Sequence, residues 1–289
     1  MSEICKNWSQ WLKATRFSYM DETQVTQTLN WLSLVRDAVL ENADIKPFDT
    51  VIDIGTGTGL LGFGALERLD ENGSVIFSDK FEDCLLECKK LLDTMSVAPQ
   101  FSFLPSGCEK MDLPSDSVDK ALMRSVLVHI LDKQTAINEI HRILKPAGVF
   151  SAFEPVIRSN TRYYELISPD KISDYNDFKK AEMEFMSSSE DSLTNFDENT
   201  LEENLKVAGF ATVDLNVQSA ESTYVVQQNT VESWFDAPPS PGKASMKQKF
   251  LTYFDESKVN NYIQEVKADL SGKQISVKAN TVFIKAIKN

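Results

Sequence analysis

Hydrophobic residues change their spacing near residue 46 of the chain. Over residues 1–45 large apolar residues recur at helical spacing, which predicts helices. From there on, short apolar runs such as 50–54 and 74–79 alternate with helical stretches such as 60–69 and 81–95. Further strands are expected at 101–104, 119–123 and 149–153, and a further helix at 130–144. Strands that alternate with helices predict right-handed βαβ units and a mostly parallel sheet with helices on both faces.

The regular alternation ends at Pro155. Residues 156–200 are polar and rich in Ser, Asp, Asn and Tyr, which indicates a helical cap or a lid. The segments that follow are expected to be a helix at 201–207, a strand at 211–217, a helical insertion at about 230–270 and a last strand at 275–287. We therefore expect an N-terminal helical lid (1–45), a ligand-binding core (46–155), a cap insertion (156–200) and a C-terminal part of the core (201–289).

Charge and composition exclude several classes of protein. The net charge is −13 and the pI about 4.7, so a nucleic acid would be repelled, and no run of Lys or Arg offsets this. The four cysteines form no CxxC pair and the two histidines are far away, so no metal site is expected. No apolar stretch approaches the roughly 18 residues of a membrane span, and the N-terminal residues lack a secretory pattern. We expect a cytoplasmic monomer or homodimer that binds a small molecule, without a nucleic-acid or membrane partner.

A glycine-rich loop, DIGTGTG, spans residues 53–59 between an expected strand and an expected helix. Glycines at such a turn supply positive φ and let a ligand approach the backbone. The dinucleotide pattern G-x-G-x-x-G is absent, since Leu60 stands where its third glycine would fall. Asp53 would repel a pyrophosphate but suits S-adenosylmethionine (SAM), which carries a sulfonium and an ammonium group and no phosphate. Asp79 ends the next strand, where a carboxylate accepts hydrogen bonds from both ribose hydroxyls; its alternative role is a helix N-cap.

On these and further stretches the chain resembles the class I SAM-dependent methyltransferases, in particular the ubiquinone/menaquinone-type group. The stretches are VIDIGTGTGLLG, SVIFSDKF, MDLPSDSVDKALM and INEIHRILKPAGVFSAFEP, and the resemblance covers residues 45–155 best and 201–217 moderately. It implies an α/β fold with a Rossmann-like, doubly wound sheet of seven strands whose last strand is antiparallel. It also implies methyl transfer from SAM, with S-adenosylhomocysteine as the product.

The resemblance further implies a set of cofactor contacts. The glycine loop would hold the methionine part of SAM, Asp79 the ribose, and the residues after the second and third strands the adenine. The residues concerned are Asp53, Gly55, Thr56, Gly57, Gly59, Asp79, Lys80, Cys108, Glu109 and Ser125. Two positions depart from the pattern of the group. Gly107 stands where members often have an acid, and Arg124 stands where small residues are common.

Methyl transfer from a sulfonium depends chiefly on how the acceptor is placed, and a general base is needed only where the acceptor must lose a proton. The candidate catalytic residues are His129, Glu154 and Arg124. His129 follows the fourth strand, and an imidazole suits a base near neutral pH; packing against the next helix is its alternative. Glu154 ends the fifth strand and is expected to be a base or a substrate ligand. Arg124 is expected to bind a substrate carboxylate or phosphate, or to pair with a nearby acid.

Two other functions stay open at the level of sequence. A nicotinamide-dependent oxidoreductase is disfavoured by Asp53 and by the position of the third glycine. A non-catalytic SAM-binding protein of the same fold is disfavoured by the intact glycine loop, although Gly107 in place of an acid favours it. The residue types leave the methyl acceptor and the methylated atom open.

Overall fold

The computed structural model describes residues 3–14, 17, 21–227, 230–239 and 242–289. The chain divides into two compact units. The first unit consists of Met1–Pro155, Glu198–Val217 and Val282–Asn289, and the second of Val156–Asp197 and Gln218–Thr281. Each unit therefore collects segments that are distant in the sequence. Two long strands, β6 (Phe210–Val225) and β7 (Gln274–Lys288), contribute residues to both units.

The strands form one seven-stranded sheet in the order β3-β2-β1-β4-β5-β7-β6. The first five strands are β1 (Thr50–Ile54), β2 (Ser74–Asp79), β3 (Gln100–Pro105), β4 (Val118–Arg124) and β5 (Leu144–Pro155). These five pair in parallel, and β1 lies between β2 and β4. β7 runs the other way, because the chain that leaves β5 pairs Val156 with Asn280 and then Thr161 with Lys278. The last strand is therefore antiparallel, as expected.

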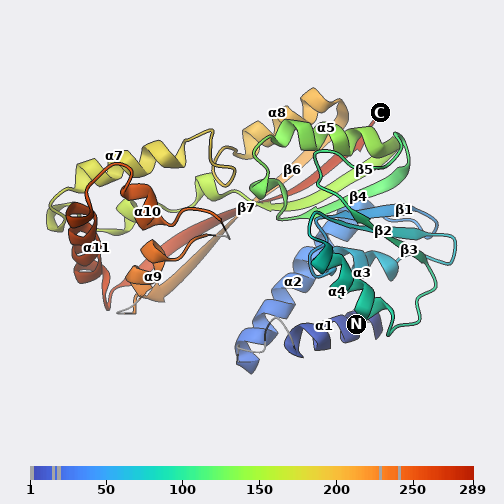
Figure 1. Ribbon diagram of the computed structural model, residues 1–289, viewed down its shortest axis with the longest axis horizontal. Helices are drawn as coiled ribbons and strands as arrows, with labels where there is room; N and C mark the ends of the chain where they lie inside the picture. The colour runs from blue at the N-terminus through green and yellow to red at the C-terminus, as the bar shows by residue number, and fades with distance from the viewer. Residues whose placement is uncertain (1–2, 15–16, 18–20, 228–229, 240–241) are drawn as a thin grey trace. The chain divides into compact units, whose positions relative to one another are not determined.

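Helices cover both faces of the sheet in the first unit (Figure 1). They are α1 (Glu3–Ala14), α2 (Glu22–Ala43), α3 (Leu60–Leu66), α4 (Glu82–Leu92), α5 (Lys133–Ile143) and α8 (Glu198–Ala208). One face carries α2, α3 and α4, with α1 packed on α3, and the other carries α5 and α8, which pack on each other. The connections from β1 to β2 and from β2 to β3 run toward one edge of the sheet, whereas the connection from β4 to β5 runs toward the other edge. Because such connections are right-handed, their helices lie on opposite faces of the sheet. The predicted α/β class and doubly wound, seven-stranded sheet are confirmed.

The main core of the first unit lies between the sheet and α1–α4. It includes Leu32 and Val39 of α2, Phe63 of α3 and Phe77 of β2. The rings of Phe63 and Phe77 lie 5.6 Å apart. This packing fixes the direction of α3 against β1 and β2, and it therefore supports the turn that joins β1 to α3.

The second unit has a core of its own. Its helices are α6 (Tyr163–Leu166), α7 (Tyr175–Met186), α9 (Thr230–Asp236), α10 (Met246–Phe250) and α11 (Glu256–Leu270). The ring of Phe178 on α7 stacks on Tyr262 of α11 with centroids 3.7 Å apart, and Phe235 and Phe250 are buried beside them. The stretch 230–270, expected as a helical insertion, contains α9, α10 and α11, and these helices share one core with those that follow Pro155.

Several strands are longer than the sequence predicts, and β6 exceeds its prediction most. The pattern predicts a strand at 211–217, whereas β6 continues to Val225. The additional residues are mostly polar and exposed, so no apolar alternation marks them. Beside the end of β6, Val226 exchanges backbone hydrogen bonds of 2.9 Å with Gly272 and Lys273, which directly precede β7.

No helix among the described residues is long and apolar enough to cross a membrane.

Candidate functional site

The turn between β1 and α3 holds three glycines in the left-handed region, as the sequence predicts. The φ angle is +67° at Gly55, +51° at Gly57 and +82° at Gly59. A Cβ at Gly55 would clash with the Val126 side chain, and one at Gly59 would clash with the ring of Phe63. For a Cβ at Gly57 the nearest described atom is the Gly55 carbonyl oxygen, at 3.9 Å. Gly55 and Gly59 are thus packed against protein, whereas Gly57 presents bare backbone to a ligand.

Asp53 is buried at the end of β1. Its Oδ2 accepts hydrogen bonds from the Thr56 hydroxyl at 2.7 Å and from the Gly62 N–H at 2.8 Å. Burial raises the pKa of the Asp53 carboxyl to about 6. The side chain ties the start of the glycine loop to the first turn of α3. Its contact with a cofactor stays a prediction.

Asp79 links the end of β2 to the glycine loop. Its Oδ2 accepts a hydrogen bond from the Gly57 N–H and its Oδ1 one from the Phe81 N–H, both at 2.9 Å. The N-cap position of α4 is Phe81, so the alternative role of Asp79 as N-cap is wrong. The Thr56 N–H adds a second link by donating to the Ser78 carbonyl at 2.8 Å. The Asp79 carboxylate therefore lies beside the open glycine.

A cavity of about 490 Å³ adjoins the glycine loop inside the first unit. Its walls include Trp8 of α1, Trp31 of α2, Gly57 and Thr58 of the loop, and Arg124 of β4. The Trp8 Nε1–H donates to the Thr58 carbonyl at 2.7 Å, so α1 is fastened directly to the loop. The cavity is large enough for a small organic molecule. It combines aromatic walls with a guanidinium group.

Arg124 is the charged group among the described residues of this wall. Its Nε is buried and has no hydrogen-bond partner among the described residues, and its guanidinium lies 5.4 Å from the centroid of the Trp31 ring. Burial lowers the pKa of Arg124, while the charges of Glu154 and Asp53 act to raise it. The alternative role of Arg124 in an ion pair is not seen, since no carboxylate of the described residues lies within 4.0 Å of its nitrogens. A half-buried guanidinium with an unpaired, buried Nε–H is suited to bind a carboxylate.

Glu154 is fully buried and fixes the turn that follows β4. Its Oε1 accepts hydrogen bonds from the N–H groups of Val126 at 2.8 Å and Leu127 at 3.0 Å. Its Oε2 accepts one from the Val128 N–H at 3.1 Å. Burial raises the pKa of the Glu154 carboxyl to about 7. Both oxygens therefore hold the turn whose Val126 packs against Gly55, and a role of Glu154 as a base or substrate ligand stays a prediction.

Two further predicted residues lie in the same turn. Ser125 has a φ of +55°, and its N–H donates to the Phe153 carbonyl at 2.8 Å. His129 ends a short 3-10 turn, Leu127–His129, and its side chain is exposed. His129 is therefore reachable from solvent, and its role as a general base stays a prediction.

The residues predicted to surround the adenine lie after β2 and β3. Lys80 is exposed, and its Nζ lies 4.9 Å from the centroid of the Phe81 ring. Cys108 is buried, and burial raises the pKa of its thiol to about 12. Glu109 is exposed, with Oε2 3.7 Å from the Cys108 Sγ. The thiol is thus protonated near neutral pH, which disfavours a role as a nucleophile.

Sequence reasoning missed Trp31. It is one helical turn from Thr28 on α2, and both line the cavity beside Arg124. The helical spacing of the N-terminal residues indicates a helix but not which face meets the glycine loop. Trp31 also packs edge-on against Phe153 at the end of β5, with ring centroids 5.9 Å apart.

Comparison with known proteins decides the family. The profile of a methyltransferase domain matches residues 45–237, which is more than half of the chain. The chain belongs to this methyltransferase domain family. The match begins just before β1 and includes the glycine loop, Asp79 and Arg124.

Two curated relatives of this methyltransferase domain share one name. The ubiquinone/menaquinone biosynthesis C-methyltransferase of Xanthomonas oryzae pv. oryzae is 28% identical over 106 residues, which cover 37% of this chain and 42% of that protein. The protein of the same name from Escherichia coli O1:K1 is 24% identical over 132 residues, 45% of this chain and 53% of that one. The chain thus spans about half the length of these relatives. The resemblance to the ubiquinone/menaquinone-type group is confirmed.

Solved structures share the fold of the methyltransferase domain. The YcgJ protein of Bacillus subtilis gives a TM-score of 0.55 at 14% identity, over 89% of this chain and 99% of that one. The phosphoethanolamine N-methyltransferase 2 of Haemonchus contortus, solved with S-adenosyl-L-methionine, gives 0.52 at 15% identity, over 97% of this chain and 60% of that one. At these identities the likeness concerns the fold.

Proposed function

We propose that this methyltransferase domain transfers the methyl group of SAM to a small-molecule acceptor in the cytoplasm. The observation that carries the proposal is the joint placement of Asp79 and Gly57. The carboxylate holds the N–H of the one loop glycine whose face is open, and that glycine lines a cavity of about 490 Å³. A cationic, phosphate-free nucleoside such as SAM matches this combination of acid and bare backbone.

The residues present fit the parts of SAM. Asp79 would accept hydrogen bonds from the ribose hydroxyls, at the end of β2 next to the first crossover. Gly57 would let the methionine part pass close to the backbone. Asp53 lies at the start of the same loop. Arg124 would bind the carboxylate of the methionine part, because its buried Nε–H is unpaired among the described residues.

The chemistry then depends on placement. When bound, SAM supplies an electrophilic methyl carbon on a sulfonium. The walls formed by Trp8 and Trp31 would exclude water and hold an acceptor in line with the methyl group, which can contribute roughly 7–11 kcal/mol to catalysis. His129 is the proposed base where the acceptor must lose a proton, since its side chain is exposed next to β4.

The class of acceptor follows from charge and cavity. The net charge of −13 disfavours a nucleic acid. The aromatic residues Trp8, Phe17 and Trp31 in the cavity wall favour an acceptor with a flat apolar part. The relatives named as ubiquinone/menaquinone biosynthesis C-methyltransferases agree with an acceptor of that kind.

Calorimetric titration of SAM and S-adenosylhomocysteine into the purified protein tests this proposal, with Asp79→Asn as the informative variant. Loss of a hydrogen bond to a charged group costs about 1.5–3 kcal/mol, so the affinity should fall roughly 10- to 100-fold. Asp83→Asn is the matched control, because Asp83 is exposed in the first turn of α4. Thermal melts of both variants show whether the loop still folds. A folded wild-type protein that binds neither ligand would rule the proposal out.

A further inference from the structure

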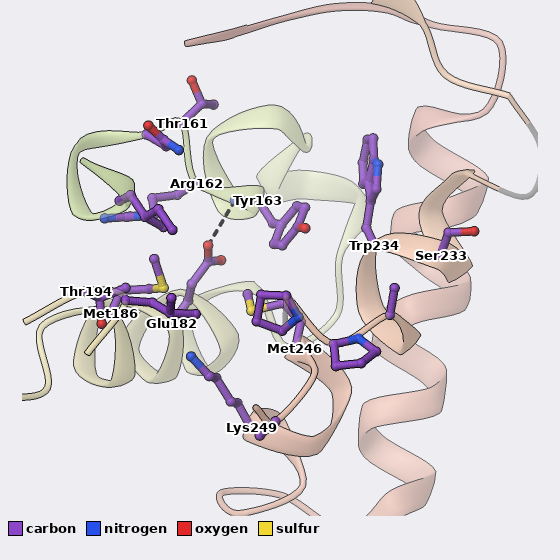
Figure 2. A pocket seen from close by; sticks show the side chains of 17 residues that line it. Thr161, Arg162, Tyr163, Glu182, Met186, Thr194, Ser233, Trp234, Met246 and Lys249 are labelled. Atoms are coloured by element: carbon purple, nitrogen blue, oxygen red, sulfur yellow. Dashed lines mark hydrogen bonds between the residues drawn. The ribbon is translucent and has the colours of Figure 1, made fainter. Parts of the chain in front are cut away.

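The second unit contains a cavity of its own, of about 400 Å³ (Figure 2). Every described residue that lines it belongs to the second unit, and these residues come from α6, α7, α9, α10, the segment before α6 and the segments that follow α7 and α9. Apolar side chains such as Met186 and Met246 make up much of the wall. A cavity of this volume is suited to a small organic ligand.

Two aromatic rings form one side of this cavity. Tyr163 of α6 and Trp234 of α9 lie nearly parallel, with centroids 5.6 Å apart and planes inclined by 26°. Figure 2 shows the two side chains next to each other above Met246. The ring of Phe235 lies 5.2 Å from Tyr163 on the core side and supports it. These rings offer an electron-rich surface to a ligand.

Glu182 of α7 brings a carboxylate to the same cavity. Its side chain points toward Tyr163 in Figure 2 and is 1% exposed. Oε1 accepts a hydrogen bond from the Tyr163 N–H at 3.0 Å, and Oε2 a longer one from the Tyr164 N–H at 3.4 Å. Within the described part of the chain no Lys or Arg nitrogen lies within 4.0 Å of it. Burial raises the pKa of this carboxyl to about 7, while the N–H groups of Tyr163 and Tyr164 and the charge of Arg162 act to lower it.

The cations in the cavity wall are directed to other partners. The Arg162 guanidinium donates to the Ile157 carbonyl at 3.2 Å and to the Arg158 carbonyl. The Lys249 ammonium forms an ion pair with Asp191 at 2.6 Å. Arg162 acts on the Glu182 carboxylate only through space, as a lesser influence than burial. The Arg162 guanidinium keeps its positive charge, because carbonyl groups do not neutralise it, but its N–H groups are engaged. Glu182 is the one carboxylate among the described residues that line the cavity, so it is the group with which a ligand's cation would pair.

A second polar group in the wall lacks a partner. The Thr194 Oγ1 is buried and has no hydrogen-bond partner among the described residues, although a buried hydroxyl is nearly always paired. Thr194 lines the cavity together with Glu182. Two buried polar groups, a carboxylate with no described Lys or Arg nitrogen within 4.0 Å and a hydroxyl without a partner among the described residues, are what a polar ligand would satisfy.

We propose that this cavity binds a small aromatic amine. Its ammonium group would pair with Glu182, its ring would lie against Trp234 and Tyr163, and the Thr194 hydroxyl would accept a further N–H. An ammonium ion gains from a buried carboxylate and from the faces of aromatic rings, whereas a carboxylic acid would be repelled. The inference is independent of methyl transfer, because no residue of the glycine loop takes part in it.

Titration calorimetry at about pH 8 with two probes of similar shape tests the proposal. 2-Phenylethylamine carries an ammonium group, and 3-phenylpropionate carries a carboxylate on a comparable chain. We expect the wild-type protein to bind the amine at least roughly tenfold more tightly than the acid. The reason is that loss of one hydrogen bond to a charged group lowers an affinity by that factor or more. Equal affinities, preference for the acid, or binding of neither probe would overturn the proposal.

Two variants place the binding in this cavity. Glu182→Gln removes the charge and should weaken amine binding by roughly tenfold or more, while Glu184→Gln, at an exposed position on the same helix, should leave it unchanged. If circular dichroism shows that Glu182→Gln does not fold, Trp234→Leu serves instead, because Trp234 lies at the edge of the core and its loss removes the ring surface. Unchanged amine affinity in a folded Glu182→Gln, or failing that in Trp234→Leu, would show that the amine binds elsewhere and would overturn the assignment.

Discussion

Replacing Glu154 by glutamine should change the stability of the protein in a pH-dependent way. In the wild-type protein the pKa of Glu154 is raised from its usual 4.5 to about 7 by burial. Between these values the folded protein keeps a proton that the unfolded chain has released, so stability falls as the pH rises from about 4.5 to about 7. A difference of this size corresponds to about 3 kcal/mol. The amide of glutamine does not ionise, so the variant is free of this loss.

The hydrogen bonds act in the opposite direction. The carboxylate accepts from Val126, Leu127 and Val128, whereas an amide has one oxygen and an NH₂ group that would face a backbone N–H. That mismatch costs about 1–3 kcal/mol at any pH. At about pH 5 the wild-type carboxyl is neutral, and the variant should be less stable by this amount. At about pH 8 the wild-type protein carries the buried charge, and the difference should shrink or change sign.

Urea unfolding at the two pH values, followed by tryptophan fluorescence, measures this shift. Three of the four tryptophans, Trp8, Trp11 and Trp31, belong to the first unit, so the signal reports chiefly on the unit that holds Glu154. Glu71→Gln is the control, because Glu71 is exposed in the turn before β2. A stability difference between wild type and Glu154→Gln that is the same at both pH values would refute the account of Glu154 as a buried, charge-carrying acceptor.

Two further predictions separate folding from binding in the glycine loop and its cavity. Gly59→Ala should lower the unfolding free energy by several kcal/mol, because its Cβ would meet the ring of Phe63 and its φ is +82°. Gly57→Ala should cost about 1 kcal/mol of backbone strain and should chiefly weaken the binding of SAM, measured by calorimetry. Equal losses of stability in the two variants would contradict this. The wild-type protein should bind SAM more tightly than decarboxylated SAM, and Arg124→Gln should reduce this preference by roughly tenfold. An undiminished preference would show that Arg124 does not hold the carboxylate.

The sequence predicts the fold best where each strand is buried on both faces. The runs at 50–54 and 74–79 are apolar because parallel strands between two helical layers meet no water, and their bounds agree with β1 and β2. The second half of β6 could not be predicted in this way. It is exposed and polar, and its partner β7 begins about fifty residues later in the chain, so local sequence carries no sign of the pairing.

The candidate site could also be predicted only in part from the sequence. The glycine loop and Asp79 could be placed from sequence because a strand–turn–helix unit fixes their geometry within a few residues. Glu154 could be placed at the right edge of the sheet, but its role depends on the N–H groups of residues 126–128, which reach it through a tertiary fold. Trp31 depends on which face of α2 meets the cavity, and neighbouring residues do not determine that face.

The three acids of the site share a feature that bears on how their substitutions should be interpreted. Asp53, Asp79 and Glu154 each accept a backbone N–H from the glycine loop, the start of α3 or the turn after β4. Two of them do so at a cost, since burial raises the pKa of Asp53 to about 6 and that of Glu154 to about 7. The loops are therefore held in place before a ligand arrives, which reduces the entropy lost on binding. Substitution of Asp53 or Glu154 should thus weaken SAM and S-adenosylhomocysteine equally, and for Glu154→Gln the loss of stability should be present at about pH 5 and shrink or reverse at about pH 8. Arg124, whose Nε–H is unpaired among the described residues, should affect affinity without that loss of stability.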